Sequence, residues 1–327
     1  MSSRNGRRVN ASRSGAGFPL IADVFKARNF LLTGATGFLG KVWLYLMLRW
    51  HPEVDRIYLL IRGDKRSSLS RFRREILDSP VMAPLREHLG SKFDHYIEEK
   101  IFVVPGDITE DGLIAPDGDR FKRGALDAVV HCAGLVNFEA SLEKGLLVNT
   151  FGVANVLDFC RKTGAAIMHI STCYSAGHAD GHRFEDDIPI DWCPDDRRRG
   201  FKLQREIRDA RAAVDRIEAG SHDQVQQSEF RTHADDDDHD PREGVQESRR
   251  KRWIEDRLKE EGLQRALKWG WPNTYSYTKS MGEQLVLAAR DELDAAVVRP
   301  AVIESAMRDP FPGWNGCVAA SAAARRA

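Results

Sequence analysis

The 327-residue sequence predicts an α/β fold, in which helices cover both faces of a doubly wound, mostly parallel sheet. Short unbroken apolar runs alternate with longer segments of helical periodicity, and a glycine-rich turn follows the first run. Strands that are buried on both faces are apolar throughout, so this alternation indicates a parallel sheet. Ligands of such sheets bind at the carboxyl ends of the strands.

Six apolar runs are the predicted strands, and most are separated by predicted helices. The strands are residues 29–33, 57–61, 101–104, 128–131, 165–170 and 295–298. The helices are residues 38–50, 69–77, 146–161 and 275–290. The pattern breaks between residues 177 and 270, where the chain is strongly polar. The sheet is therefore expected to be completed by strands from both sides of a charged insert.

Composition divides the chain into five segments. They are a disordered basic tail at 1–22, an α/β domain at 23–177, a charged insert at 178–270, the completion of the α/β domain at 271–316, and a low-information tail at 317–327. The first tail is rich in Arg and Ser, which would also suit a transit peptide. It has no apolar core of a cleaved secretory signal.

The insert is predicted to contain solvated helices over residues 202–218 and 247–269. Between Gly220 and Gly244 it has little to bury, which favours disorder. The acidic run 235–238 lies beside His233 and His239, a composition that would also suit a loosely bound metal. We interpret the run as a solvated charge cluster and predict no metal site.

Charge and cysteine content exclude several classes of protein. Lys and Arg together number 49, as do Asp and Glu, and this zero balance argues against nucleic-acid binding. Apolar runs all fall short of the ~18 to 20 residues of a membrane span. The five cysteines form no C-x-x-C pair, which argues against a disulfide framework or a zinc site. A cytoplasmic location is the simplest expectation.

The glycine-rich turn has the composition of a phosphate-binding loop. Gly34, Gly37 and Gly40 have G-x-x-G-x-x-G spacing between the first strand and the first helix. Gly34 permits a tight turn, Gly37 lets the backbone approach a pyrophosphate, and Gly40 lets the helix pack close to the sheet. The helix N-terminus then presents free N–H groups to the phosphates. The context predicts a Rossmann-like dinucleotide-binding domain.

The end of the second strand indicates which dinucleotide is bound. An NAD site usually has an acid there, which binds the ribose hydroxyls. This chain has Arg62 instead, with Lys65 and Arg66 close by, and a guanidinium suits the 2′-phosphate of NADP. Asp64 complicates the prediction because a carboxylate could also bind an unphosphorylated ribose. We predict NADPH as the cofactor.

Tyr275 and Lys279 are four residues apart and therefore share one face of the predicted helix. An ammonium near a phenol favours the phenolate, so the pair could exchange a proton with a substrate oxygen. Tyr277 has no lysine four residues later. Ser171 and Thr172 end the fifth strand at the carboxyl edge of the sheet, and Thr172 is the better candidate for a substrate-binding hydroxyl.

Together these residues resemble the extended short-chain dehydrogenase/reductase superfamily, and within it the fatty acyl-CoA reductases of the male-sterility and thioester-reductase type. The matching segments are TGATGFLGK (33–41), YLLIRG (58–63), VPGDIT (104–109), HCAGLVNF (131–138), VNTFGVANVLDFC (148–160), STCYSAG (171–177), NTYSYTKSMGE (273–283), VVRPAVIES (297–305) and DPFPGW (309–314). Glycine turn and Y-x-x-x-K belong to the whole superfamily, whereas LLIRG, NTYSYTK and DPFPGW point to the acyl reductases.

The resemblance implies a role for individual positions of this chain. It implies pyrophosphate contacts from Thr36, Gly37, Phe38 and Leu39 within the turn between Gly34 and Gly40. It further implies an adenosine-phosphate contact from Arg62, adenine contacts from Asp107 and Ile108, and cofactor-lining positions at Ala133 and Gly134. Asn149 would support the active site, Thr172, Tyr275 and Lys279 would be the catalytic triad, and Lys279 would also hold the nicotinamide ribose.

The activity implied by the resemblance is NADPH-dependent reduction of a fatty acyl thioester to an aldehyde, an alcohol or both. The thioester would be carried by coenzyme A or by an acyl-carrier protein, and a peripheral membrane contact stays open. Family members continue into a substrate-binding region after the DPFPGW segment, so the C-terminus is predicted to be truncated. The alternatives are another extended reductase, such as a sugar-nucleotide epimerase or dehydratase, and an inactive NADP-binding fragment.

Overall fold

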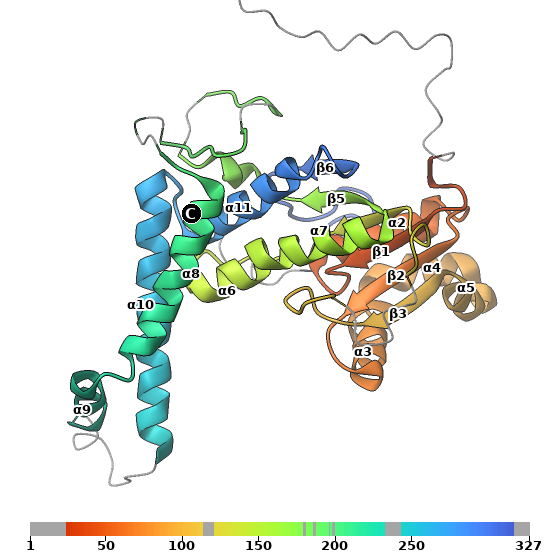
Figure 1. Cartoon of the computed structure of the whole chain (residues 1–327). Helices are drawn as coiled ribbons and strands as arrows, with labels where there is room; N and C mark the ends of the chain where they lie inside the picture. The colour runs from red at the N-terminus through yellow and green to blue at the C-terminus, as the bar shows by residue number, and fades with distance from the viewer. Residues whose placement is uncertain are drawn as a thin grey trace, which may run out of the picture.

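A computed structural model of the chain contains six parallel strands in the order β3-β2-β1-β4-β5-β6 (Figure 1). The strands are β1 (Asn29–Thr33), β2 (Arg56–Ile61), β3 (Ile101–Pro105), β4 (Ala128–His131), β5 (Ala166–Ile170) and β6 (Ala295–Val298). The structure describes residues 24–113, 121–178, 181–185, 188–195, 197, 200–232 and 243–316. Strand order reverses between β1 and β4, which confirms the predicted doubly wound sheet and places its ligand crevice at that point.

The register aligns the carboxyl ends of the central strands. Thr33 of β1 pairs with His131 of β4, and His131 pairs in turn with His169 of β5. The Thr33 hydroxyl lies 2.7 Å from His131 Nδ1, so the ends of β1 and β4 are also joined through side chains. Residues that follow these strands are consequently brought to one edge, although they are far apart in the sequence.

Helices on the two faces of the sheet enclose two apolar cores. The first core lies between the sheet and α2 (Phe38–Trp50), α4 (Ala83–Leu89) and α5 (Phe93–Lys100). The second core lies between the sheet and α7 (Gly152–Thr163) and α11 (Thr274–Ala288). These layers are the predicted ones. Two helices, α4 and α5, form over residues that the sequence analysis assigned to no element.

Two of the predicted helices contain turns of a different winding. The helix predicted at 69–77 is α3 (Lys65–Phe72), continued by a π-helical turn, η1 (Arg73–Leu77). The helix predicted at 146–161 comprises α6 (Leu142–Leu146), a π-helical turn η5 (Leu147–Phe151) and α7. Such π turns within α-helices are frequent at functional sites, and η5 contains Asn149.

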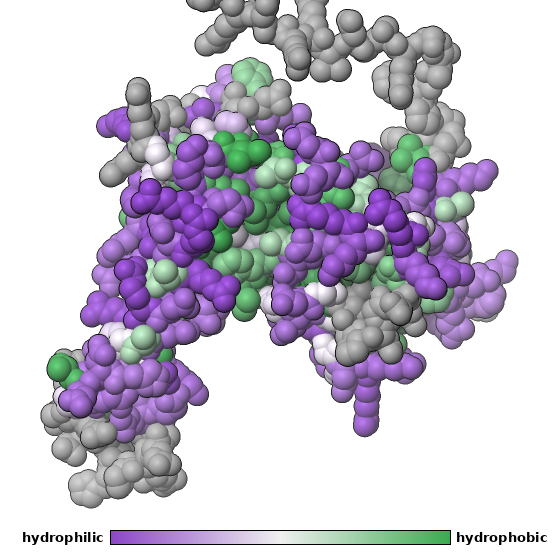
Figure 2. All heavy atoms as spheres, viewed as in Figure 1, coloured by the Kyte–Doolittle hydropathy of each residue, from purple (hydrophilic) through white to green (hydrophobic). Residues whose placement is uncertain are grey.

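The charged insert forms a helical arm that projects from the sheet domain (Figure 1). It consists of α8 (Leu203–Gly220), α9 (Gln224–Thr232) and α10 (Glu243–Trp269). Figure 2 shows hydrophilic residues over most of the arm and hydrophobic residues gathered between the arm and the sheet domain. A third apolar core, which includes Leu142, Trp271 and Tyr277, joins the arm to helices α6 and α11 of the sheet domain.

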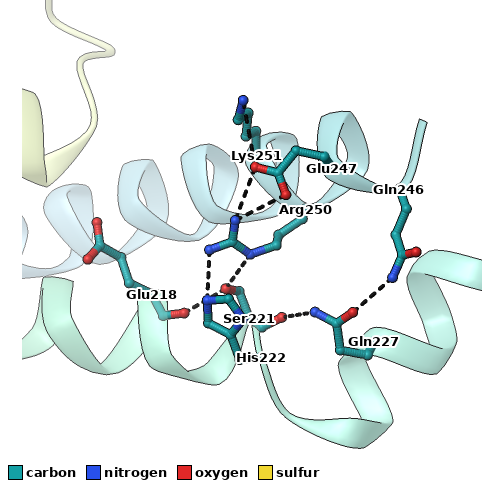
Figure 3. Close-up of polar contacts among 8 residues, drawn as sticks. All are labelled: Glu218, Ser221, His222, Gln227, Gln246, Glu247, Arg250 and Lys251. Carbon is teal, nitrogen blue, oxygen red and sulfur yellow. Dashed lines mark hydrogen bonds and ion pairs between the residues drawn. The ribbon is translucent and has the colours of Figure 1, made fainter. Parts of the chain in front are cut away.

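The outer part of the arm corrects one expectation. Disorder was favoured between Gly220 and Gly244. Residues 233–242 of that stretch lie outside the described residues, but residues 224–232 form α9, and Phe230 is buried against Trp253 of α10. Figure 3 shows the polar contacts that fix this turn. Arg250 donates to the Ser221 hydroxyl at 3.0 Å, and Gln227 donates to the Ser221 carbonyl at 2.8 Å. Tertiary contacts with α10 thus compensate for the low apolar content.

The predicted tails at 1–22 and 317–327, and the acidic run 235–238 with His233 and His239, lie outside the described residues. The described part of the chain has no helix that combines the length and apolar character of a membrane span. Its cysteines at positions 132, 160, 173 and 193 form no disulfide. The described residues also contain no group of acidic, His and Cys side chains suited to a metal ion.

A buried polar cluster fixes the base of the arm to α11. Glu206 of α8 is only 3% exposed and accepts hydrogen bonds from the Tyr277 hydroxyl at 2.7 Å and from Arg265 of α10 at 2.9 Å. Burial, followed by the Glu206 charge, raises the pKa of Tyr277 well above its ordinary value, so this phenol stays protonated. Three helices therefore share one carboxylate.

We predict that Glu206→Ala destabilises the protein by about 3 kcal/mol, because it leaves the buried Tyr277 hydroxyl without its acceptor and leaves Arg265 with only the Glu261 carboxylate. Chemical denaturation monitored by circular dichroism measures this change. Glu260→Ala is the control, since Glu260 forms an exposed pair with Arg257 and its loss is expected to change stability by less than about 0.5 kcal/mol. Equal effects from the two variants would contradict a structural role for the cluster.

Candidate dinucleotide and catalytic site

The glycine turn forms a close-packed cradle at the end of β1. Gly34 has a φ of +72°, and an added Cβ there would lie 2.6 Å from the backbone nitrogen of Ala133. A Cβ on Gly40 would lie 2.3 Å from the Gly34 carbonyl oxygen. Larger residues would force these backbone segments apart. The packing thus places Ala133, after β4, directly against the turn.

The N-terminus of α2 is open to an anion. Gly37 is its N-cap and has no side chain to bond the first helical N–H groups, and the first turn contains no acid. Unpaired N–H groups and the positive end of the helix dipole favour a phosphate at this position. The cradle therefore fits a dinucleotide pyrophosphate. Thr36 and Leu39 are half-buried beside it, as is Phe38, whose ring stacks on Trp314 with centroids 5.0 Å apart.

The basic segment after β2 lies at the same edge of the sheet. Arg62, Lys65 and Arg66 are all exposed at the N-terminal end of α3. Asp64 is the N-cap of α3 and accepts hydrogen bonds from the Ser67 N–H at 2.7 Å and the Ser67 hydroxyl at 2.6 Å. The hydroxyl bond lowers the pKa of Asp64. One oxygen of this carboxylate, Oδ1, is therefore engaged in capping the helix.

The predicted adenine residues follow β3. Asp107 accepts a hydrogen bond from the Thr109 N–H at 2.9 Å, and Ile108 is buried against Gly152 at the start of α7. The structure brings both residues to the carboxyl edge that also carries Arg62. Their contact with adenine stays a prediction.

Asn149 connects the loop after β4 to α11. Its Oδ1 accepts the Leu135 N–H at 2.9 Å, and its Nδ2 donates to the Leu135 carbonyl and the Thr278 hydroxyl, both at 3.2 Å. Gly134 lies between these groups, and a Cβ there would be 3.8 Å from Lys279 Nζ. Asn149 is therefore a positioning group for the loop that faces Lys279.

The proposed catalytic residues meet at the end of β5. Tyr275 and Lys279 lie on α11, whose N-cap Asn273 accepts the Ser276 N–H at 2.9 Å. The Thr172 side chain lies beside Tyr275 and acts to lower the pKa of its phenol, and Lys279 Nζ donates to the Ile170 carbonyl at 2.6 Å. All three catalytic candidates are at least nine-tenths buried. Of the two hydroxyls after β5, Thr172 is the one beside Tyr275, whereas Ser171 bonds Glu283.

The electrostatics of this group correct one expectation. Lys279 was expected to favour the Tyr275 phenolate, but burial raises the pKa of Tyr275 above its ordinary value, and the neighbouring Thr172 side chain opposes this rise. Burial lowers the pKa of Lys279 to about 8, and the charge of Glu283 opposes that shift. The ammonium bonds the Ile170 carbonyl in this structure. Tyr275 therefore stays protonated at neutral pH.

The family model described as male sterility protein matches residues 32–319, which is most of the chain. The chain belongs to this family. The matched region contains the glycine cradle, Arg62 and the Thr172, Tyr275 and Lys279 group. The match and the cradle together support a nicotinamide dinucleotide as the ligand of this male sterility protein domain.

Two similar plant proteins have names that state an activity. Fatty acyl-CoA reductase 1 of Arabidopsis thaliana is 34% identical over 88% of this chain and 54% of its own length. The alcohol-forming fatty acyl-CoA reductase of Simmondsia chinensis is 30% identical over 90% of this chain and 55% of its own. The chain spans about half the length of these relatives. The terminal R domain of the myxalamid pathway has a TM-score of 0.49 and 19% identity, covering 86% of this chain and 50% of that one.

Sequence reasoning missed several groups around the catalytic residues. Phe138 is half-exposed, with its ring centroid 5.6 Å from that of Tyr275 and 6.0 Å from that of Tyr174. His131 and His169 stack behind the site, and burial, reinforced by the Lys279 charge, lowers the pKa of His131 to about 3. In the sequence, the only feature that could have indicated His131 is its position at the end of a predicted strand. The aromatic contacts join segments that the sequence does not relate.

We predict that Gly40→Ala lowers the melting temperature of the protein without ligand, because the added Cβ overlaps the Gly34 carbonyl; the loss is about 1 to 3 kcal/mol. Gly37→Ala is the matched variant. Gly37 is exposed, and a Cβ there would lie 3.2 Å from the same oxygen. It is expected to weaken dinucleotide binding in calorimetry with a smaller change in melting. An unchanged melting temperature for Gly40→Ala would refute the close-packed cradle.

Proposed function

We propose that this domain catalyses NADPH-dependent reduction of a fatty acyl thioester, with acyl-CoA as the preferred form and an acyl-carrier protein as the alternative carrier. The observation that carries the proposal is the Thr172 and Tyr275 hydroxyl pair, with Lys279 one helical turn away, at the sheet edge that also carries the glycine cradle. The names of the similar plant proteins support the acyl-CoA substrate class.

When bound, the reduced nicotinamide supplies a hydride to the thioester carbonyl carbon. The Thr172 and Tyr275 hydroxyls are placed to donate hydrogen bonds to the carbonyl oxygen and stabilise its developing negative charge. Tyr275 then gives its proton to that oxygen, so that a hemithioacetal forms. Loss of the thiol from the hemithioacetal leaves an aldehyde. A second hydride and a second proton from Tyr275 would convert the aldehyde to the alcohol.

Lys279 supports this chemistry through its charge. Its pKa of about 8 keeps it an ammonium at neutral pH, where its charge stabilises the Tyr275 phenolate left after the proton is given up. The same ammonium is proposed to hold the nicotinamide ribose. Asn149 positions the loop of Gly134, which faces Lys279, and Ala133 is proposed to line the cofactor site beside the glycine turn.

Preference for NADPH rests on the charges around α3. Arg62, Lys65 and Arg66 supply three cations near one helix N-terminus, and the one acid between them, Asp64, caps that helix. A 2′-phosphate needs such cations, and a guanidinium can bind it through two hydrogen bonds. A cytoplasmic location is part of the proposal and rests on the scattered cysteines, which form no C-x-x-C pair.

We predict that Arg62→Ala weakens NADPH binding by about 10- to 100-fold, the value of a charge-assisted hydrogen bond, and leaves NADH binding nearly unchanged. Titration calorimetry with each cofactor measures the two affinities. Arg73→Ala, an exposed change eight residues beyond Lys65, is the control and is expected to alter neither. Equal losses for both cofactors in Arg62→Ala would show that Arg62 does not read the 2′-phosphate.

We predict that Tyr275→Phe lowers turnover of acyl-CoA by about 100- to 10,000-fold while NADPH binding and folding survive, because only the proton donor is lost. The assay follows NADPH oxidation with palmitoyl-CoA, and the epimerase alternative is tested by following conversion of a UDP-sugar by chromatography, because epimerisation consumes no NADPH. Tyr277→Phe is the control, since the Tyr277 hydroxyl is bonded to Glu206 and belongs to the arm. It is expected to lose stability and keep most of its turnover below its melting temperature. The reverse order would assign catalysis to the other tyrosine.

A further inference from the structure

A fully buried carboxylate lies beneath the catalytic group and has no part in the chemistry described above. Glu283 is 0% exposed and lies on α11, one helical turn after Lys279. Its Oε1 accepts hydrogen bonds from Arg299, at 2.9 Å from Nε and 2.8 Å from Nη2. Its Oε2 accepts from the Ser175 hydroxyl at 3.0 Å and from the Ser171 hydroxyl. Both oxygens are therefore engaged.

The two serines lie on either side of Thr172. Thr172 is the N-cap of a single helical turn, η6 (Cys173–Ala176), and its hydroxyl oxygen accepts the Tyr174 N–H at 3.2 Å. Ser171 precedes this cap and Ser175 lies within the turn, and their hydroxyls are 3.1 Å apart. Because both serines bond the same oxygen of Glu283, the turn that presents Thr172 is held at both ends by one carboxylate.

The backbone after β6 completes this connection. The Ser171 N–H donates to the Val298 carbonyl at 2.8 Å, and the Cys173 N–H donates to the Pro300 carbonyl at 3.0 Å. Arg299 lies between these two acceptors and directs its side chain to Glu283. Glu283 thus joins three segments: the helix that carries Tyr275 and Lys279, the turn that carries Thr172, and the strand extension beside that turn.

From these contacts we propose that Glu283 is a positioning residue of the proposed reductase, which holds the Thr172 hydroxyl in register with Tyr275 and keeps Lys279 charged. The inference rests on the proposed function for the identity of the reaction. The contacts of Glu283 with Arg299, Ser171 and Ser175, here called the clamp, are a property of the fold. A buried carboxylate without partners would be strongly destabilising, and here Arg299 compensates its charge. The two serines then use the second oxygen to fix the turn.

The charge of Glu283 also acts on Lys279. Around Lys279, the groups that titrate are Tyr275 and Glu283 on the same helix, His131 and Cys132 at the end of β4, and His169 on β5. Arg299 faces Glu283 from the segment after β6. Burial lowers the pKa of Lys279 to about 8, and Glu283 is the larger of the two contributions that oppose this. Removing the carboxylate therefore lets the ammonium lose its proton at a lower pH.

The test compares Glu283→Gln with the double variant Ser171→Ala and Ser175→Ala. Glu283→Gln removes the charge and keeps the shape, whereas the serine variant removes the bonds to the turn and keeps the Glu283–Arg299 pair. NADPH affinity is measured against pH by cofactor fluorescence, and turnover is measured with palmitoyl-CoA and with a fatty aldehyde. The control is Glu292→Gln, an exposed carboxylate paired with Arg161 at the opposite end of the sheet.

In Glu283→Gln, the alkaline loss of NADPH affinity is expected to move to lower pH by about one unit, because an opposite charge has been removed. In the serine variant this profile is expected to stay in place, while turnover falls about 10-fold or more with NADPH affinity retained. The control should match the unmodified protein in every measurement. If Glu283→Gln does not fold, the serine variant alone decides whether the turn is positioned by the clamp.

Two results would overturn the inference. One is an unshifted pH profile in Glu283→Gln together with full turnover in the serine variant. The other is a loss of turnover that merely follows the fraction unfolded in each variant. Failure of the proposed function would give a different result, because the unmodified protein would then reduce neither the thioester nor the aldehyde. In that case the pH dependence of NADPH affinity in Glu283→Gln would still test the inference.

Discussion

The burial of a polar helix is the constraint on which the rest of the structure depends. Helix α11 crosses the interior with Ser276, Thr278, Lys279, Glu283 and Gln284 all buried. Polar groups removed from water are strongly destabilising unless they find hydrogen-bond partners inside the protein. Ser276 bonds the N-cap Asn273, and the other four side chains are each bonded to a different part of the chain, so the helix determines where those parts lie.

The partners of α11 come from almost every region of the domain. Thr278 contacts Asn149 in the π-helical turn, Lys279 contacts the end of β5, and Glu283 contacts the turn after β5. Gln284 accepts from the Trp192 N–H at 3.4 Å and donates to its carbonyl at 3.1 Å. The hydrogen bonds that pair the buried polar groups of α11 therefore also assemble the site, because they hold the segments that carry the candidate catalytic side chains.

The charged arm has a comparable dependence on α11. Its two long helices meet that helix through Glu206, Arg265 and Tyr277, which form one buried cluster. The neighbouring tyrosine, Tyr275, faces the end of β5 and carries the proton of the proposed reaction. Two residues of one helical turn thus serve different surfaces, and the helical rotation of about 100° per residue separates them.

Local sequence determined much of this protein. Apolar runs predicted every strand to within two residues at each end, because strands buried on both faces leave an unbroken apolar signal. The cradle of Gly34, Gly37 and Gly40 was predictable because steric limits make glycine necessary where backbones approach so closely. The i, i+4 spacing placed Tyr275 and Lys279 on one face of α11 in the same way.

Only the tertiary structure decided the features that depend on partners distant in sequence. α9 formed despite its polar sequence, because α10 supplies contacts that no local pattern records. Burial reversed the expected pKa shift of Tyr275, and the structure assigned Asp64 to a helix cap and Ser171 to Glu283. Burial and long-range hydrogen bonds are properties of the packed chain, so the residue types alone could not determine them.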